Sequence, residues 1–362
     1  MRVAEGSSAV QNGSDAVATP QGYTVRAGDI VDDGEQIVEL WRGGLALHGR
    51  PAKKLDWYYR HAVEGSPEVY VLMGAGEAAG VAAIGPRRMQ LNREVLFGGM
   101  LVDFVALPAH RTFFPAMLLQ REVHRRALET HDLLFGFPNS SAAPILRRVG
   151  YRCVGQLVRR ARVLRSAGNL ANFLPRWISI VVGGLADRVR LALVRFRRLS
   201  YAGIESSWLD GIDDRFDDLW ERVNVDGILT GVRDRRFLKW RFEDCPFQTY
   251  RYFGVFESGK PALLAYAVCE ATGTTLQVHD FLVASASPVA RDCLWLDLIT
   301  EATRLGYTSL SVVFMGSDVE RSALARAGFI VRDERPVFAA WAAPAVQQGF
   351  ADWYLTAADE DS

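Results

Sequence analysis

Two Asp-Phe pairs are the residues in this sequence best suited to acid–base chemistry. Asp103-Phe104 and Asp280-Phe281 each follow an apolar segment with strand-like composition. A carboxylate at the end of a buried strand can have a raised pKa, which lets it act as a general base. An aspartate that recurs in this setting can also hold a loop or cap a helix, and this structural role is the favoured one for both residues.

The phenol of Tyr59 is a second group that could transfer a proton. Tyr59 ends the run Leu55-Asp56-Trp57-Tyr58-Tyr59, whose aromatic side chains can equally form the apolar face of a helix. We name Asp103 and Tyr59 as the candidate catalytic residues.

The four cysteines and six histidines show no metal-binding pattern, because no C-x-x-C, H-x-x-x-H or H-E-x-x-H spacing occurs. The sequence therefore predicts no metal site. The 42 basic and 42 acidic side chains cancel, which excludes a uniformly basic nucleic-acid-binding protein.

The elements that must position these residues occur twice along the chain. The segment 55–59 resembles 238–242 at an offset of 183 residues, and Asp103 resembles Asp280 at an offset of 177. Three more pairs keep the same order: the hairpin turns 74–77 and 257–260, the strands 133–137 and 310–314, and the segments 146–151 and 324–329. Five matches in register indicate a tandem duplication.

Each copy has the pattern of a helix, two hairpin strands, a third strand, a helix, a strand, a helix and two final strands. This order predicts an α/β (α+β) fold with a mixed sheet and helices on both faces. We expect a disordered tail at 1–22, domains at 23–165 and 201–345, a connector at 166–200 and a C-terminal tail at 346–362.

The repeating unit resembles the GNAT superfamily of acyl-CoA-dependent N-acyltransferases, duplicated in tandem. In that family a bulged fourth strand precedes an Arg/Gln-x-x-Gly-x-Gly/Ala loop, which opens a helix whose N-terminal amides hold the pyrophosphate of coenzyme A. In the first copy Arg111, Pro115 and Ala116 fit this pattern, whereas Phe114 replaces the first glycine. The second copy, at 283–291, lacks both the glycine and the expected arginine, so the first copy is favoured as the acyl-donor site.

The fifth strand strengthens the resemblance. Residues 135–140 resemble the Gly-Phe-Pro-Asn segment of tandem GNAT-like proteins often found with bacterial polysaccharide biosynthesis. In GNAT folds the fourth and fifth strands splay apart here, and the pantetheine arm inserts like an added strand. The residues implied in binding acyl-CoA are Val105, Arg111, Thr112, Phe113, Phe114, Pro115, Ala116 and Asn139.

The activity that the resemblance implies is transfer of an acyl group, such as acetyl from acetyl-CoA, to an amine. The acceptor would be an amino sugar or another polysaccharide precursor, and a backbone N–H near Val105 would hold the oxyanion. The tyrosine acid usual in the family has no counterpart at 140–149. A non-catalytic binding or scaffold protein derived from the GNAT fold is therefore the alternative.

The connector carries most of the charge asymmetry. Residues 133–200 contain thirteen arginines and one acid, and residues 201–226 contain eight acids and two arginines. The apolar, arginine-rich segment 174–199 could lie on an anionic membrane, or it could pack across both domains with its arginines facing the acidic stretch. The second arrangement is favoured.

The N-terminal residues lack the basic and apolar regions of a signal peptide. We expect a cytoplasmic protein, peripheral at the inner membrane face if the connector binds lipid. The acceptor identity, acyl chain length and oligomeric state do not follow from the sequence.

Overall fold

The computed structural model describes residues 22–45, 50–166, 176–223, 226–285, 287–343 and 352–360. Nearly all of the predicted tail at 1–22 lies outside these ranges.

The first copy has the predicted order of elements with two differences: a strand precedes the first helix, and one long final strand replaces the predicted two. It consists of β1 (Tyr23–Gly28), α1 (Gly34–Gly44), α2 (Pro51–Lys54), the π-helical turn η1 (Leu55–Arg60), β2 (Glu68–Gly74), β3 (Glu77–Leu91), β4 (Glu94–Ala106), the 3-10 turn η2 (Pro108–His110), α3 (Phe113–Ala127), β5 (Leu133–Gly136), α4 (Ala143–Val149) and β6 (Arg152–Val163).

The connector helix α6 (Arg176–Arg198) leads to the second copy, which repeats this order with two additional strands. The second copy consists of β7 (Ile204–Leu209), α7 (Asp214–Glu221), β8 (Ile228–Gly231), α8 (Arg235–Leu238), the π-helical turn η3 (Lys239–Glu243), β9 (Tyr250–Glu257), β10 (Leu263–Thr272), β11 (Thr275–Val283), α9 (Pro288–Arg304), β12 (Ser309–Met315), α10 (Asp318–Arg326), β13 (Ile330–Trp341), β14 (Asp352–Thr356) and the 3-10 turn η4 (Ala357–Asp359). The repeated order and the mixed sheet confirm the predicted fold class.

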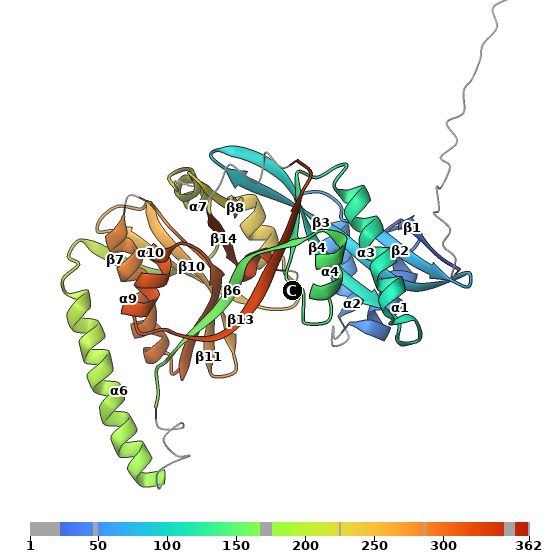
Figure 1. Cartoon of the computed structure of the whole chain (residues 1–362). Helices are drawn as coiled ribbons and strands as arrows, with labels where there is room; N and C mark the ends of the chain where they lie inside the picture. Colours follow the sequence, from blue (N-terminus) through green and yellow to red (C-terminus); the bar gives the residue numbers. More distant parts are fainter. Residues whose placement is uncertain are drawn as a thin grey trace, which may run out of the picture.

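The equivalent strands β6 and β13, which end the repeating unit, are exchanged between the two copies. The strand order is β1-β2-β3-β4-β5-β13-β6-β12-β11-β10-β9-β7, so β13 pairs with β5 of the first copy and β6 pairs with β12 of the second. The boundaries predicted at 165 and 201 divide the chain by repeat, whereas each half of the sheet needs a strand from both repeats (Figure 1).

The strands β8 and β14 close the centre of the sheet into a ring. β14 pairs with β12 and with β8, and β8 pairs with β3. Pairing therefore runs from β3 through β4, β5, β13, β6, β12, β14 and β8 and back to β3. Closure leaves these strands without exposed edges along their paired lengths.

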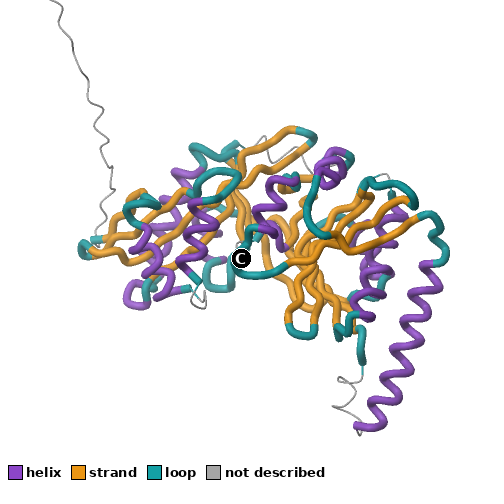
Figure 2. Tube along the Cα trace, turned by 180° about the vertical axis from the view of Figure 1, so that it is seen from behind, coloured by secondary structure: helices purple, strands orange, loops and turns teal. Residues whose placement is uncertain are grey.

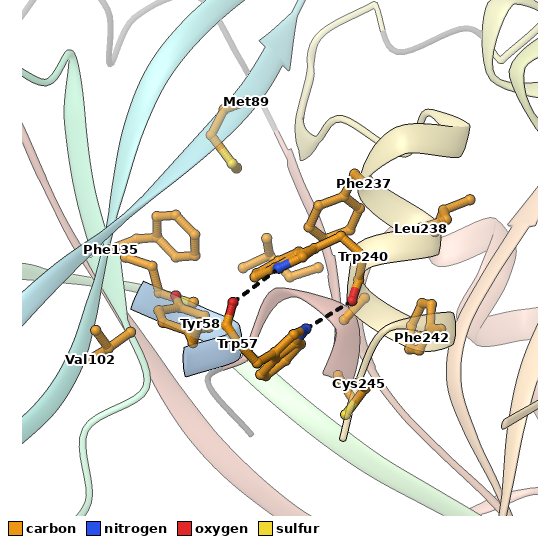
Figure 3. Packing of buried hydrophobic residues seen from close by; sticks show 14 of the residues in the cluster. Trp57, Tyr58, Met89, Val102, Phe135, Phe237, Leu238, Trp240, Phe242 and Cys245 are labelled. Atoms are coloured by element: carbon orange, nitrogen blue, oxygen red, sulfur yellow. Dashed lines mark hydrogen bonds between the residues drawn. The ribbon is translucent and has the colours of Figure 1, made fainter. Parts of the chain in front are cut away.

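The two copies meet at equivalent residues in the main core. The rings of Trp57 and Trp240 stack with centroids 5.0 Å apart and planes at 19° (Figure 3). Each indole N–H donates to the other residue's carbonyl oxygen, over 3.1 Å from Trp57 and 3.4 Å from Trp240. Both side chains are buried, so this mutual pairing satisfies indole donors that could not reach water.

The predicted C-terminal tail is wrong for residues 352–360. This segment forms β14 and η4, and its Asp359 is fully buried. The guanidinium of Arg233 donates to Asp359 over 2.6 Å, and that of Arg87 donates over 2.9 Å. The acidic composition suggested solvent exposure, but two buried arginines supply the opposite charge.

Replacement of Asp359 by asparagine should destabilise the protein. Burial disfavours the carboxylate, but Arg233 and Arg87 outweigh this effect and hold the pKa of Asp359 below its usual range. Loss of the charge leaves two buried guanidinium groups undercompensated, at a cost of about 3 kcal/mol in the free energy of unfolding. Urea denaturation of Asp359→Asn measures this cost, with the exposed Asp352→Asn as a control that should change little.

The contacts of Asp359 with Arg233 and Arg87 also predict how the free energy of unfolding depends on pH. The lowered pKa means that the contribution of Asp359 is complete above the pKa of an unfolded aspartate, about 4, and is lost as the pH falls through the folded value. Equal acid sensitivity of the wild type and Asp359→Asn would contradict this assignment.

Among the described residues, the connector helix α6 packs mainly on α9 of the second copy, and it also contacts the residues after β6, where Asp187 accepts hydrogen bonds from Ser166. Its Arg198 pairs with Asp297 of α9 at 2.7 Å, and Arg197 donates to the carbonyl of Arg326. The prediction that α6 packs across both domains and meets the acidic stretch is wrong. The stretch instead pairs locally, as in Asp213 with Arg215. No helix in the described ranges is both long enough and apolar enough to cross a bilayer.

Candidate functional site

The strands β4 and β5 separate after a short parallel pairing. Their register runs from Gly98 opposite Leu133 to Met100 opposite Phe135 and then stops. Gly136 permits this geometry, because a Cβ there would lie 2.8 Å from the Cβ of Leu101. Beyond this point the facing edges of the two strands diverge.

A bulge in β4 turns the strand at the same level. Val81 pairs with Val105 and Ala83 pairs with Val102, so two residues of β4 oppose one of β3. Asp103 lies in the bulge with a φ of 51°, a left-handed conformation that is uncommon outside glycine.

A cavity of about 300 Å³ occupies the space between the separated strands. Its wall includes Lys54, Asp103, Phe104, Phe137, Asn139 and Ala142. The volume and the mixed polar and apolar lining suit a small organic group.

The carboxylate of Asp103 is held by two buried donors. The ammonium of Lys54 donates to Oδ1, and the hydroxyl of Tyr59 donates to Oδ2, each over 2.6 Å. All three side chains are buried. The α2–η1 segment thus supplies both donors and fixes the strained backbone of the bulge.

The sequence analysis named Asp103 and Tyr59 but missed Lys54. The sequence could have indicated Lys54, because it comes directly before the run 55–59. A lysine next to a buried helix face needs a buried acidic group as its partner. Asp103 lies on the cavity wall, whereas Tyr59 reaches it only through Asp103.

The second copy contains the same kind of group at the corresponding aspartate. Asp280 accepts from Arg233 at 3.0 Å and from Tyr266 at 2.6 Å. The tyrosine now comes from β10 instead of the π-helical turn. Because a cation and a tyrosine hold the aspartate in both copies, the contacts support the loop-holding role that the sequence favoured.

Val105 pairs with Val81 of β3 and is not among the residues that line the cavity, whereas Phe104 is. Leu107 N–H donates to Ala79 on β3 over 2.9 Å. Because successive amides of a strand alternate in direction, we infer that the amide of Val105 also faces β3 and that of Ala106 faces the open side of β4. The amides of Phe104 and Ala106 are therefore further candidates for the oxyanion donor.

The predicted anion-binding loop precedes α3. Thr112 is the N-cap, and Phe113, Phe114, Pro115 and Ala116 form the first turn, with Pro115 and Ala116 buried. Arg111 is exposed, and its Nε donates to the carbonyl of Ala106 over 3.2 Å. The guanidinium of Arg148, which the sequence analysis missed, lies 4.5 Å from the centre of the Phe113 ring.

Asn139 lies on the cavity wall and organises the start of α4. Its Oδ1 accepts from the backbone N–H groups of Ser141 at 3.1 Å and Ala142 at 2.9 Å. Its side chain therefore shapes the cavity through the loop after β5.

Gln120 is a further polar residue of the cavity that the sequence analysis missed. Its side chain is 2% exposed and lies on the cavity wall, and Oε1 has no hydrogen-bond partner among the described residues. A glutamine on the apolar face of α3, between Ala116 and Val123, was the signal in the sequence. Because a buried amide oxygen without a partner costs free energy, this atom is available to a ligand.

Comparison with solved structures identifies the architecture. A probable N-acyltransferase from Enterococcus faecalis superposes with a TM-score of 0.62 at 10% identity, over 88% of this chain and 72% of that one. A GCN5-related N-acetyltransferase from Anabaena variabilis gives 0.61 at 11% identity, over 88% and 73%. A tandem GNAT protein from the clavulanic acid biosynthesis pathway gives 0.53 at 13% identity, over 89% and 99%.

The chain has a tandem GNAT fold. No protein-family model and no curated protein sequence matches it. The predicted fold is thus confirmed.

The two GNAT units differ in what lies between their separated strands. In the second unit β11 and β12 pair only as far as Val278 opposite Val312. Beyond them, Phe314 and Met315 pair with Thr356 and Leu355 of β14. Since β6 takes the other edge of β12, β14 lies on the β11 side, within the separation.

The same positions line the cavity in the first GNAT unit. Phe137 and Pro138 correspond to Phe314 and Met315 at the offset of 177, and both lie on the cavity wall. Thr356 also donates to Asp280 over 2.6 Å. The C-terminal strand therefore occupies the strand separation of the second unit, and a cavity of about 290 Å³ remains beside it, with Val283, Val319 and Tyr354 on its wall.

Removal of the Asp103 charge tests the role of the buried group. Asp103→Asn leaves the Lys54 ammonium without its counter-charge and should lower the free energy of unfolding by about 3 kcal/mol. The double variant Lys54→Met/Asp103→Asn removes both charges, keeps a residue that tolerates the left-handed backbone, and should recover part of this loss. Urea denaturation measures both, and additive losses in the double variant would contradict the pairing.

Proposed function

We propose that the protein is an acyltransferase that moves an acyl group from acyl-CoA, with acetyl-CoA the smallest donor, to an amine. The reaction takes place in the cavity of the first GNAT unit. The observation that carries this proposal is a difference between the two units. The strand separation of the first unit is open and lined by a cavity, whereas in the second unit β14 pairs within the separation and the remaining cavity lies beside β14.

The open separation fits an extended acyl-pantetheine chain. A chain in this position pairs with the unpaired edges of β4 and β5, as β14 pairs with β12 in the second unit. Gln120 Oε1 accepts a hydrogen bond from an amide N–H of that chain. At the start of α3 the free amides, Arg111 and Arg148 favour the pyrophosphate.

The chemistry that the cavity supports is direct attack of the amine on the thioester carbonyl. The C–N bond forms and the C–S bond breaks, while the amides of Phe104 and Ala106 stabilise the oxyanion. Asp103 on the cavity wall takes the proton of the amine with a lone pair that Lys54 and Tyr59 do not use, so it acts as the base while the two donors keep it in its loop-holding position. No tyrosine is among the described residues of the wall, so the leaving thiolate takes its proton from water.

The acceptor class proposed is an amino sugar or another polysaccharide precursor. Its support is the resemblance of residues 135–140 to a segment of tandem GNAT-like proteins of that setting. Release of free thiol from acetyl-CoA, measured with a panel of amines, tests the class. If amino acids or polyamines are acylated and amino sugars are not, the proposed acceptor class is wrong and the acylated class takes its place.

A binding protein without catalysis is the second candidate. It is favoured by one observation, the occupation of both Asp103 oxygens by Lys54 and Tyr59. Acetyl-CoA that binds in calorimetry but releases no thiol with any amine of the panel would support this candidate.

A bulky side chain in the cavity should abolish binding of the acyl donor. Ala142→Trp fills the space beside Asn139 and should remove the calorimetric signal of acetyl-CoA. Val319→Trp is the matched control, because Val319 is the repeat partner at the offset of 177 and is 54% exposed. Loss of binding in Val319→Trp alone would move the site to the second unit.

Gln120 should contribute to affinity for acetyl-CoA. Gln120→Met keeps the length of the side chain but removes its hydrogen-bonding groups, so the affinity should fall about fivefold. Calorimetry gives this ratio. The thermal stability should stay the same or rise, because the substitution removes an unpaired buried polar atom. Unchanged affinity would place the ligand away from α3.

A further inference from the structure

One face of α6 is an apolar stripe that faces solvent. We define the α6 stripe as Val182, Leu185, Val189, Leu193, Phe196 and Leu199, whose exposed fractions run from 47% to 78%. The residues recur at intervals of three and four, so they lie along one side of the helix. Large apolar side chains in such a contiguous row mark an interaction surface.

The opposite face of α6 holds the helix against the second GNAT unit. Val194 is buried in the core beside α9, and Arg198 pairs with Asp297. Gly183 is also buried on this side. Figures 1 and 2 show α6 along the outer edge of the molecule, next to α9 and away from the first GNAT unit. The helix is therefore anchored by one face and presents the α6 stripe outward.

Arginines border the α6 stripe on both sides. With 3.6 residues per turn, Arg188 and Arg195 lie along one border, and Arg190 and Arg197 lie along the other. Arg188 and Arg195 are exposed. The one acid of the segment 182–199, Asp187, lies on the anchored side, where it accepts hydrogen bonds from Ser166.

Arg190 pairs with Asp187 at 3.6 Å, whereas Arg188 and Arg195 have no acidic partner among the described residues. Partial burial and the nearby guanidinium groups of Arg190 and Arg197 lower the pKa of Arg162. An exposed apolar row with cationic borders is complementary to a bilayer that carries negative headgroups.

We propose that α6 binds the surface of an anionic lipid bilayer, with its axis in the membrane plane and the α6 stripe in the acyl–headgroup boundary. Arg188 and Arg195 then reach lipid phosphates, and the second GNAT unit lies directly above the membrane. The first GNAT unit, with its cavity, extends along the molecule away from α6. This placement does not depend on the reaction that the cavity performs.

Flotation of the full-length protein with vesicles tests the proposal. Vesicles of equal parts phosphatidylglycerol and phosphatidylcholine should carry the protein, and vesicles of phosphatidylcholine alone should bind it far more weakly. Binding to the anionic vesicles should weaken as salt is added, because salt screens the arginine contribution. Absence of flotation, or equal binding to both vesicle types, would overturn the proposal.

Two variants separate the apolar and the charged contributions. Leu193→Asp/Phe196→Asp should abolish flotation, because it places carboxylates in the α6 stripe. Arg188→Gln/Arg195→Gln should weaken binding to anionic vesicles about thirtyfold, at about a factor of five for each arginine. Both pairs are exposed, so circular dichroism should be unchanged.

Val95→Asp is the matched control, because Val95 is 60% exposed on β4 of the first unit. It should float like the wild type. The competing occupant is a second copy of the chain. A dimer in analytical ultracentrifugation that is lost in Leu193→Asp/Phe196→Asp, together with no vesicle binding, would assign the α6 stripe to that dimer and overturn the membrane proposal.

Discussion

Every point at which two strands of this sheet diverge leaves facing backbone N–H and C=O groups that need new partners. Buried peptide groups without partners are too costly to persist, so each divergence must be filled by protein, water or ligand. The two GNAT units meet this requirement differently. The second pairs the chain's own C-terminal strand within the divergence and keeps a cavity only beside that strand, and the first retains a cavity between the diverging strands. The rest of the architecture, including the buried charges near β14, follows from this difference.

The two units share one hydrophobic core, although their strand separations differ. The stacked pair Trp57 and Trp240 joins equivalent positions, so the symmetry of the duplication survives at the centre. Away from it, the two units use cations from different positions of the repeat. Lys54 and Arg233 each hold an aspartate in a bulged strand, although at the offset of 183 Lys54 corresponds to Phe237. Arg233 also donates to Thr356 and Asp359, so the cation of the second unit holds the C-terminal segment as well.

The order of elements and the duplication could be predicted because both depend on patterns of residues that are close together in the sequence. Apolar periodicity marks the helices and strands, and a constant offset links Asp103 to Asp280. Strand exchange could not be predicted, because nothing local to β13 distinguishes β5 from β12 as its neighbour. The acidic end of the chain suggested solvent, since the burial of Asp359 depends on Arg233 and Arg87, which are distant in sequence.

The candidate site shows the same division. Asp103 and Asn139 were found because they stand at recognisable strand ends, and both lie on the cavity wall. Lys54 and Gln120 were missed because their significance depends on which helix face meets the bulge. For α6 the periodicity of the apolar residues was visible. The sequence did not show that these apolar residues face solvent. The face of α6 that packs on the protein is formed by residues such as the small Gly183 and the ion-paired Arg198.

The strand exchange has a consequence for biosynthesis. The first unit cannot complete its sheet until β13, which ends at Trp341, has been made. Multidomain proteins commonly fold from the N-terminus while the ribosome is still translating. Here the first unit keeps an unpaired strand edge on β5 until β13 has emerged. The two units therefore fold together instead of one after the other, and the unpaired edge is exposed to aggregation until they do.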